Sequence, residues 1–198
     1  MTTHATKTSI VLGAGIMGCS LALFLARRGH RVVLIDEALE AMSGASRWNE
    51  GKIHLGFLYG ADPSLETAKK LLPGGLEFPS LIEELIEQPI REEWITQHDD
   101  RYLVHRDSVV EPEPYLAIVH RVQELAQQHE LAGRYFVDLR ESAAREISRE
   151  TLASDYDASC IKAGVEVPER SVSTQPIADC LAGAVHSHPA IEVQLGKR

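Results

Sequence analysis

Three glycines near the start of the chain constrain its fold more than any other feature. Gly13, Gly15 and Gly18 form a G-x-G-x-x-G pattern between a β-rich run and a segment with helical hydrophobic spacing. The pattern belongs to a series of elements expected at residues 8–12 (strand), 16–28 (helix) and 31–35 (strand). A strand, a helix and a second strand in this order form a βαβ unit, whose two strands lie parallel in one sheet.

Each glycine has a physical role in holding a dinucleotide. Gly13 permits a tight turn, Gly15 lets the backbone approach a pyrophosphate, and Gly18 allows close helix packing. The N-terminus of the helix offers N–H groups and a partial positive charge to the pyrophosphate. Asp36 ends the second strand, where it can accept hydrogen bonds from ribose hydroxyls, which argues against the 2′-phosphate of NADP. The predicted adenosine end of the site comprises Gly13, Ala14, Gly15, Ile16, Met17, Gly18, Asp36 and Glu37.

Composition narrows the function further. The 198 residues carry a formal net charge of −9, which disfavours a nucleic-acid partner. No apolar run is long enough to span a membrane, and the first eight residues lack a secretory signal. The three cysteines are far apart, as in reduced cytoplasmic proteins. We therefore expect a cytoplasmic protein with a small-molecule substrate. No metal is expected, because His186 and His188 have alternating spacing but no third ligand.

Beyond the βαβ unit, the hydrophobic spacing predicts both helices and strands. The segment 43–61 is rich in Gly, Ser and Asn, which predicts an extended loop. Helices are expected at 64–72, 79–87, 114–131 and 175–185, with Pro73-Gly74-Gly75 ending the first. Strands are expected at 94–96, 101–105, 134–139, 163–167 and 191–195.

The loop after Asp36 favours one dinucleotide over another. Gly13–Ala22, Leu25–Asp36 and Gly44-Ala-Ser-Arg-Trp-Asn-Glu-Gly-Lys-Ile-His-Leu-Gly56 together resemble the N-terminal part of FAD-dependent oxidoreductases of the D-amino-acid oxidase type. That group includes glycine and sarcosine oxidases and the L-2-hydroxyglutarate and glycerol-3-phosphate dehydrogenases. The third block is the most specific of the three. The resemblance implies FAD as cofactor and hydride transfer to the flavin from a small amine, amino acid or 2-hydroxy acid.

The resemblance also implies which residues of the loop contact the cofactor. Ser46 and Arg47 would contact the phosphates or the ribityl chain. The residues implied to lie near the isoalloxazine are Asn49, Gly51, Lys52, Ile53 and His54. A cation or N–H donor beside the N1/C2 carbonyl side of the flavin stabilises its reduced form, and Lys52 or His54 could supply it. Alternatively, Lys52 is a solvated surface lysine and His54 a structural loop histidine. No catalytic residue is assigned.

The expected fold class is α/β, with a Rossmann-like FAD-binding domain and part of an inserted substrate-domain β-sheet. Residues 1–90 would form the N-terminal part of the FAD-binding domain, 91–165 a partial substrate domain, and 166–198 the return to the FAD-binding domain. The family's later segments are not visible in the sequence, so the chain is expected to be the N-terminal portion of such an enzyme. Such a portion would retain flavin weakly and self-associate through exposed strand edges.

Two alternatives remain at this stage. An NAD-dependent dehydrogenase uses the same βαβ unit, but after Asp36 it would continue with further βα units in place of a Gly/Ser/Asn loop. A truncated, non-catalytic nucleotide-binding module would keep the glycine pattern without redox chemistry. Cys19, at the start of the first helix, is interpreted as a packing residue and not as a reactive thiol.

Overall fold

A computed structural model describes residues 7–197 as two compact units. Among these residues, the first unit comprises 7–51, Leu81–Trp94 and 173–197, and the second comprises Lys52–Ser80 and Ile95–Val172. The domain boundaries expected at residues 90 and 165 stay a prediction. Most of the segment used to assess a secretory signal lies outside the described residues. No helix within residues 7–197 is long and apolar enough to cross a membrane.

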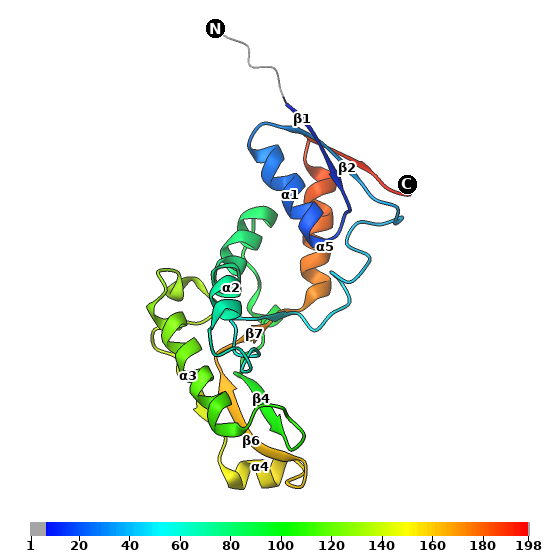
Figure 1. The fold of residues 1–198 in the computed structure, drawn as a ribbon. Helices are drawn as coiled ribbons and strands as arrows, with labels where there is room; N and C mark the ends of the chain where they lie inside the picture. Colours follow the sequence, from blue (N-terminus) through cyan, green and yellow to red (C-terminus); the bar gives the residue numbers. More distant parts are fainter. Residues whose placement is uncertain (1–6, 198) are drawn as a thin grey trace. The chain divides into compact units, whose positions relative to one another are not determined.

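A parallel three-stranded sheet forms the centre of the first unit. Its strands are β1 (Thr8–Leu12), β2 (Arg31–Ile35) and β8 (Ile191–Gln194), in the order β1-β2-β8. Helices α1 (Ile16–Arg27) and α5 (Thr174–Ser187) lie side by side against this sheet (Figure 1). Val32 and Leu34 of the central strand are fully buried. The βαβ unit and the α/β fold class predicted from the sequence are therefore confirmed.

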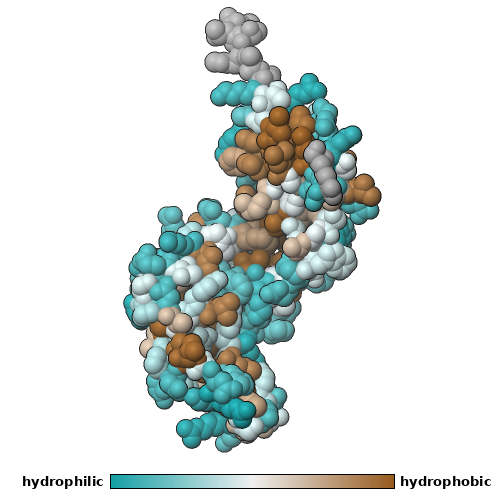
Figure 2. All heavy atoms as spheres, turned by 45° about the vertical axis from the view of Figure 1, so that its right-hand side comes forward, coloured by the Kyte–Doolittle hydropathy of each residue, from teal (hydrophilic) through white to brown (hydrophobic). Residues whose placement is uncertain are grey.

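The strand β1 stands at the edge of this sheet and carries exposed apolar side chains. Ile10 is 67% exposed and Leu12 is 78% exposed. Hydrophobic residues gather at the surface over the sheet of this unit (Figure 2). Parallel sheets are normally covered on both faces, so this surface is unusual for a strand of this kind.

The second unit contains two small antiparallel sheets. One has the order β4-β6-β5, formed by β4 (Asp100–His105), β6 (Ile161–Val167) and β5 (Arg145–Glu146). The other pairs β3 (Lys52–Ile53) with β7 (Arg170–Ser171). Within residues 7–197 the remaining helical elements are α2 (Glu66–Ile86), α3 (Pro112–Gln128), α4 (Arg149–Asp155) and two 3-10 turns, η1 (Glu92–Trp94) and η2 (Ala132–Arg134).

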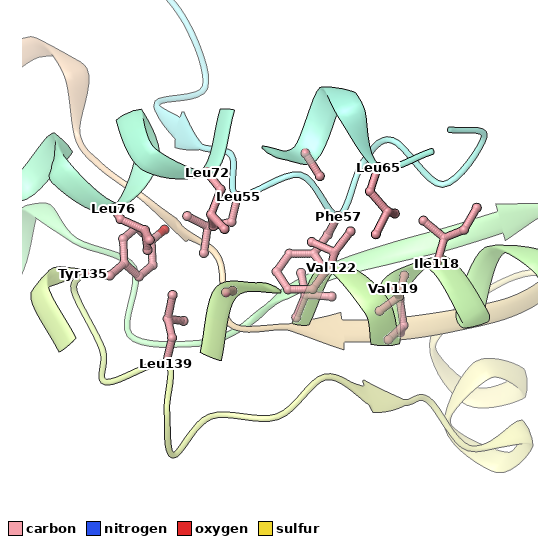
Figure 3. Packing of buried hydrophobic residues seen from close by; sticks show 14 of the residues in the cluster. Leu55, Phe57, Leu65, Leu72, Leu76, Ile118, Val119, Val122, Tyr135 and Leu139 are labelled. Carbon is pink, nitrogen blue, oxygen red and sulfur yellow. The ribbon is translucent and has the colours of Figure 1, made fainter. Parts of the chain in front are cut away.

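A hydrophobic cluster joins these elements of the second unit. In Figure 3 the labelled side chains of α2 and α3 point toward one another, with Leu55 and Phe57 among them. Val119 of α3 and Leu76 of α2 are fully buried. The cluster also includes Val165 of β6, so it links the helices to the β4-β6-β5 sheet.

The predicted helix at 64–72 was wrong in its end point. Helix α2 continues through Pro73, Gly74 and Pro79 to Ile86. Its apolar positions keep helical spacing across the first proline, and the burial of Ala68, Leu72 and Leu76 offsets the hydrogen bond that the proline removes. A Cβ on Gly75 would lie 2.8 Å from the carbonyl oxygen of His54. This glycine therefore permits close backbone approach and does not end the helix.

Two predicted strands were also wrong. The 3-10 turn η1 ends at Trp94, and Ile95 makes only an isolated bridge to Val172. Residues 135–139 follow η2 as irregular chain, in which Tyr135 and Leu139 are buried and Asp138 accepts a hydrogen bond from the backbone N–H of Arg140. The short helix α4 escaped prediction because it buries a single residue, Leu152, and so has no hydrophobic period.

Candidate cofactor site

The glycine pattern forms the turn that its spacing predicts. Gly13 has φ +93°, a conformation that favours glycine, and its N–H donates to the carbonyl of Ile35 at 2.8 Å. A Cβ on Gly18 would lie 1.7 Å from the carbonyl oxygen of Gly13 and 3.6 Å from Leu34. Gly18 therefore makes room first for the turn itself and only secondarily for helix-to-sheet packing.

The carboxylate of Asp36 lies directly beside this turn. It accepts a hydrogen bond from the N–H of Ala14 at 2.5 Å and another from the N–H of Ala38 at 2.7 Å. These backbone hydrogen bonds hold the pKa of Asp36 below its usual range. Asp36 is therefore ionised at neutral pH, and each carboxylate oxygen has further lone-pair capacity for a ribose hydroxyl. Glu37, the neighbouring predicted residue, is exposed.

The N-terminus of α1 supplies the anion-binding end of the site. Gly15 caps the helix without a side chain, the first turn contains no acidic residue, and Met17 is 81% exposed. The N–H of Ile16 donates to the Ser46 hydroxyl oxygen at 2.9 Å. The Ser46 O–H is left to donate elsewhere, as it would to a phosphate oxygen. The arrangement fits a pyrophosphate, because first-turn N–H groups lack intrahelical acceptors.

Hydrogen bonds of Arg47 attach the loop that contains Ser46 to helix α5. Its Nη2 donates to Asp179 at 2.6 Å, its Nε donates to the carbonyl of Met42 at 3.2 Å, and its own carbonyl accepts from Thr174 Oγ1 at 2.7 Å. Three N–H donors of the guanidinium remain beyond these two hydrogen bonds. Contact between Arg47 and a phosphate stays a prediction.

Asn49 and Gly51 shape the end of the same loop. The Asn49 side chain donates to the carbonyl of Ala45 at 2.7 Å and accepts from the N–H of Gly51 at 2.7 Å. Gly51 has φ +68°. Both residues therefore fix the path of the backbone, and their expected position near the flavin stays a prediction.

Lys52 and Ile53 belong to the second unit, where they form β3. Lys52 Nζ lies 3.1 Å from a carboxylate oxygen of Asp100 and 5.2 Å from the ring centre of Tyr102. Lys52 is therefore paired with a carboxylate while its side chain stays 30% exposed, and its position near the flavin stays a prediction. The carbonyl of Ile53 accepts a hydrogen bond from the hydroxyl of Tyr135 at 3.2 Å.

His54 contacts a buried carboxylate that the sequence had not indicated. Glu169 accepts hydrogen bonds from the N–H of Leu55 and from the Tyr102 hydroxyl, each at 2.5 Å. His54 Nδ1 lies 3.4 Å from the same oxygen of Glu169 that Tyr102 contacts. Burial, reinforced by the charge of Glu169, raises the pKa of Tyr102 above its usual range, so the phenol keeps its proton. Glu169 follows a proline between two strands, where no periodic pattern distinguishes it from a loop residue.

Other residues considered from the sequence have structural roles. Cys19 is fully buried, and burial together with the charge of Asp36 raises the pKa of its thiol to about 11. Its interpretation as a packing residue fits this environment. His186 lies in the last turn of α5, where its Nδ1 is 2.7 Å from the carbonyl of Ala182. In the part of the chain that the structure describes, no group of three or more side chains is arranged to hold a metal ion.

Comparison with known proteins identifies a family for nearly the whole chain. A family model described as FAD dependent oxidoreductase (DAO) matches residues 9–192. Among curated proteins, the chain is 50% identical over 48 residues to the tRNA 5-methylaminomethyl-2-thiouridine biosynthesis bifunctional protein of Ralstonia nicotianae. That match covers 24% of this chain and 7% of the relative.

Solved structures share the fold at low sequence identity. Glycine oxidase from Geobacillus kaustophilus matches with a TM-score of 0.62 and 18% identity, over 98% of this chain and 47% of that one. Iminodiacetate oxidase from Chelativorans sp. BNC1 matches with a TM-score of 0.61 and 20% identity, over 96% of this chain and 46% of that one. The chain thus spans just under half the length of these structures.

Proposed function

The chain belongs to the family of FAD-dependent oxidoreductases, and we propose that its first unit binds the ADP half of FAD. The observation that carries this proposal is the hydrogen bond between the Asp36 carboxylate and the N–H of Ala14. It supports the proposal because the ionised carboxylate of Asp36 lies beside the N-terminus of α1, where it would accept from a ribose hydroxyl while the helix N-terminus holds the pyrophosphate. The negative charge of Asp36 would repel the 2′-phosphate of NADP, so the site favours FAD over NADP.

We further propose that Ser46 and Arg47 contact the pyrophosphate or the ribityl chain. Asn49 and Gly51 would then set the backbone path, and the segment 52–54 would lie near the isoalloxazine. Support comes from the Ser46 hydroxyl, which already lies at the first N–H of α1, and from the family membership.

The proposed reaction is oxidation of a small amine, amino acid or 2-hydroxy acid. When bound, FAD accepts a hydride from the substrate carbon. The names of two structural neighbours, glycine oxidase and iminodiacetate oxidase, specify amine substrates, which supports the amine alternatives most directly. Hydride transfer leaves a proton on the substrate nitrogen or oxygen, so a proton acceptor in the protein assists the step.

We also propose a cytoplasmic protein that self-associates through the edge of β1. The exposed side chains of Ile10 and Leu12 support association, because an unpaired edge with apolar neighbours favours pairing with another strand. Replacing Ile10 with lysine is expected to shift the protein toward the monomer in light scattering. If the wild type is associated and the Ile10→Lys variant has the same molar mass, this edge has no role in the association.

Cofactor binding tests the main proposal. Purified protein is titrated with FAD, and binding is followed by flavin fluorescence and by calorimetry. Gly15→Val should abolish binding because its side chain occupies the approach of the pyrophosphate, whereas Gly183→Val in α5 should not, because a Cβ there meets nothing within 4 Å. Equal binding by both variants would refute the site. A preference for NAD would instead favour a nicotinamide-dependent dehydrogenase.

A further inference from the structure

Met42 has a backbone conformation that is unfavourable for its residue type. Its φ is +60°, in the left-handed region that bulky L residues rarely adopt. Within residues 7–197, two other non-glycine residues share this conformation, Leu65 at +61° and Glu87 at +55°. Those two flank helix α2, and a left-handed residue is common just after a helix, as at Glu87. Met42 lies inside the loop between β2 and β3, so its conformation needs another explanation.

Three contacts hold Met42 in this conformation. The residue is buried, with 2% relative exposure. Its N–H donates to the carbonyl of Ala14 at 2.7 Å, and its own carbonyl accepts from Arg47 Nε at 3.2 Å. A strained residue persists where its surroundings fix it, and such residues cluster at functional sites. Both hydrogen bonds of Met42 lead to residues that belong to the proposed cofactor site.

The hydrogen bond to Ala14 fixes the glycine turn. Ala14 stands between two glycines of the turn, whose backbones have more conformational freedom than those of other residues. Its N–H donates to the Asp36 carboxylate at 2.5 Å. Its carbonyl accepts from the N–H of Met42 at 2.7 Å and from the thiol of Cys19 at 3.3 Å. Hydrogen bonds on both sides of Ala14 therefore hold a flexible turn in one arrangement.

The hydrogen bond from Arg47 fixes the other end of this connection. Arg47 Nη2 also donates to Asp179 of α5 at 2.6 Å, so two acceptors direct the guanidinium. Rotating φ of Met42 into the negative range would turn its N–H relative to its carbonyl. The bonds to Ala14 and Arg47 could then not persist together. The left-handed conformation of Met42 therefore couples the position of the turn to the position of Arg47.

We propose that Met42 is a positioning residue for the cofactor. Its left-handed backbone holds the Ala14 peptide, and with it the Asp36 carboxylate, at a fixed position relative to Arg47 before the ADP half of FAD binds. Burial of the Met42 side chain compensates for the unfavourable conformation. A site arranged in advance binds more tightly, because less ordering accompanies binding. This inference rests on the proposed function, and every residue in it belongs to the first unit.

Two small replacements of Met42 distinguish positioning from packing. Alanine keeps the unfavourable left-handed conformation but loses the buried side chain that compensates for it. The backbone of Met42→Ala should therefore return to a negative φ and release both hydrogen bonds. Glycine loses the same side chain but adopts the left-handed conformation at no steric cost. If Met42 served to fill space alone, glycine would be the more damaging replacement, because it leaves the larger cavity.

Titration of the purified 198-residue protein with FAD, followed by flavin fluorescence, measures this order. If about a tenth of the molecules hold the competent arrangement, the apparent dissociation constant rises about 10-fold. We expect this loss for Met42→Ala and a loss of less than about 3-fold for Met42→Gly. Met42→Leu conserves the side-chain volume and should bind FAD as the wild type does. Equal affinity of the alanine and glycine variants, or weaker binding by glycine, would overturn the positioning role.

Glu87 provides the matched control. It has the same backbone conformation, belongs to the same unit, and its 81% exposed side chain pairs with Arg27 at 3.1 Å. Glu87→Gly should have a higher urea midpoint than Glu87→Ala, because glycine relieves the left-handed conformation there as well. Both variants should bind FAD with wild-type affinity. If FAD affinity followed stability at Glu87 as it does at Met42, the effect at Met42 would be one of general stability, and the positioning role would fail.

Hydrogen exchange tests the inference in the wild type without flavin. The amide of Met42 should exchange as slowly as amides inside α1, because its hydrogen bond to Ala14 holds it closed. Exchange as fast as that of exposed loop amides would overturn the inference, even if no variant of Met42 folded. If the Met42 amide is protected but the wild type binds no FAD, the proposed function fails, and the failure does not lie in the arrangement of the turn.

Discussion

Replacing Gly18 with alanine should destabilise the first unit strongly. A Cβ at this position would lie 1.7 Å from the carbonyl oxygen of Gly13 and 2.9 Å from its carbonyl carbon. Both are backbone atoms, so no side-chain rotation relieves the clash, and the turn itself must move. Overpacking typically costs 1–3 kcal/mol, and this contact lies at the upper end, about 3 kcal/mol.

The matched control is Gly183→Ala in α5. Both glycines are helical, so both replacements gain up to about 1 kcal/mol of helix propensity. A Cβ on Gly183 meets nothing within 4 Å, so this variant keeps the gain. The expected outcomes are a loss of about 2 kcal/mol for Gly18→Ala and a gain of about 1 kcal/mol for Gly183→Ala. The difference between them, about 3 kcal/mol, is the cost of the clash.

Urea unfolding, monitored by tryptophan fluorescence, measures this difference in stability for the first unit of the structure. The chain has two tryptophans, Trp48 and Trp94, and both belong to the first unit. With a denaturant slope of about 1–3 kcal/mol per M, the midpoints of the two variants should differ by about 1–3 M. Equal midpoints would show that the turn at Gly13 is not packed as described, and the geometry of the cofactor site would fail with it.

Three further predictions concern other parts of the chain. Gly75→Ala should destabilise the second unit because its Cβ would lie 2.8 Å from the His54 carbonyl, whereas Gly74→Ala should not; hydrogen exchange that is equally slow in both would contradict this. The lowered folded-state pKa of Asp36 contributes stability above about pH 4, the unfolded pKa, and this is lost as pH falls through the folded pKa. The stability difference between wild type and Asp36→Asn should therefore shrink below that pH, and a pH-independent difference would be contrary evidence. Cys19, with a pKa of about 11, should react with a thiol reagent only after unfolding, while the other two cysteines react earlier; three equally fast thiols would count against its burial.

The first unit was the part of the fold that the sequence predicted best. Its elements are local, and its signals, glycines at fixed offsets and a carboxylate at a strand end, act within a short stretch of chain. The positions of Gly13 and Asp36 follow from such local rules. The third strand of the sheet, β8, was predicted as a strand, but its pairing with β2 joins residues far apart in the sequence.

The second unit shows where local signals fail. Helix α2 runs through Pro73 because tertiary burial of its apolar face outweighs the lost hydrogen bond, and propensity alone cannot show this. The carboxylate of Glu169 became visible only when the fold brought it to His54 and Tyr102. Their separations in sequence carry no motif, so no pattern could have assembled them.

Competition between nucleotides tests the central claim most directly. FAD is bound to the purified protein and then displaced by increasing concentrations of ADP or of 2′,5′-ADP. Binding through the Gly13 turn and Asp36 predicts that ADP displaces FAD, whereas 2′,5′-ADP does so far more weakly because its 2′-phosphate meets the Asp36 carboxylate. Equal displacement by the two nucleotides, or none by ADP, would contradict the proposed adenosine site.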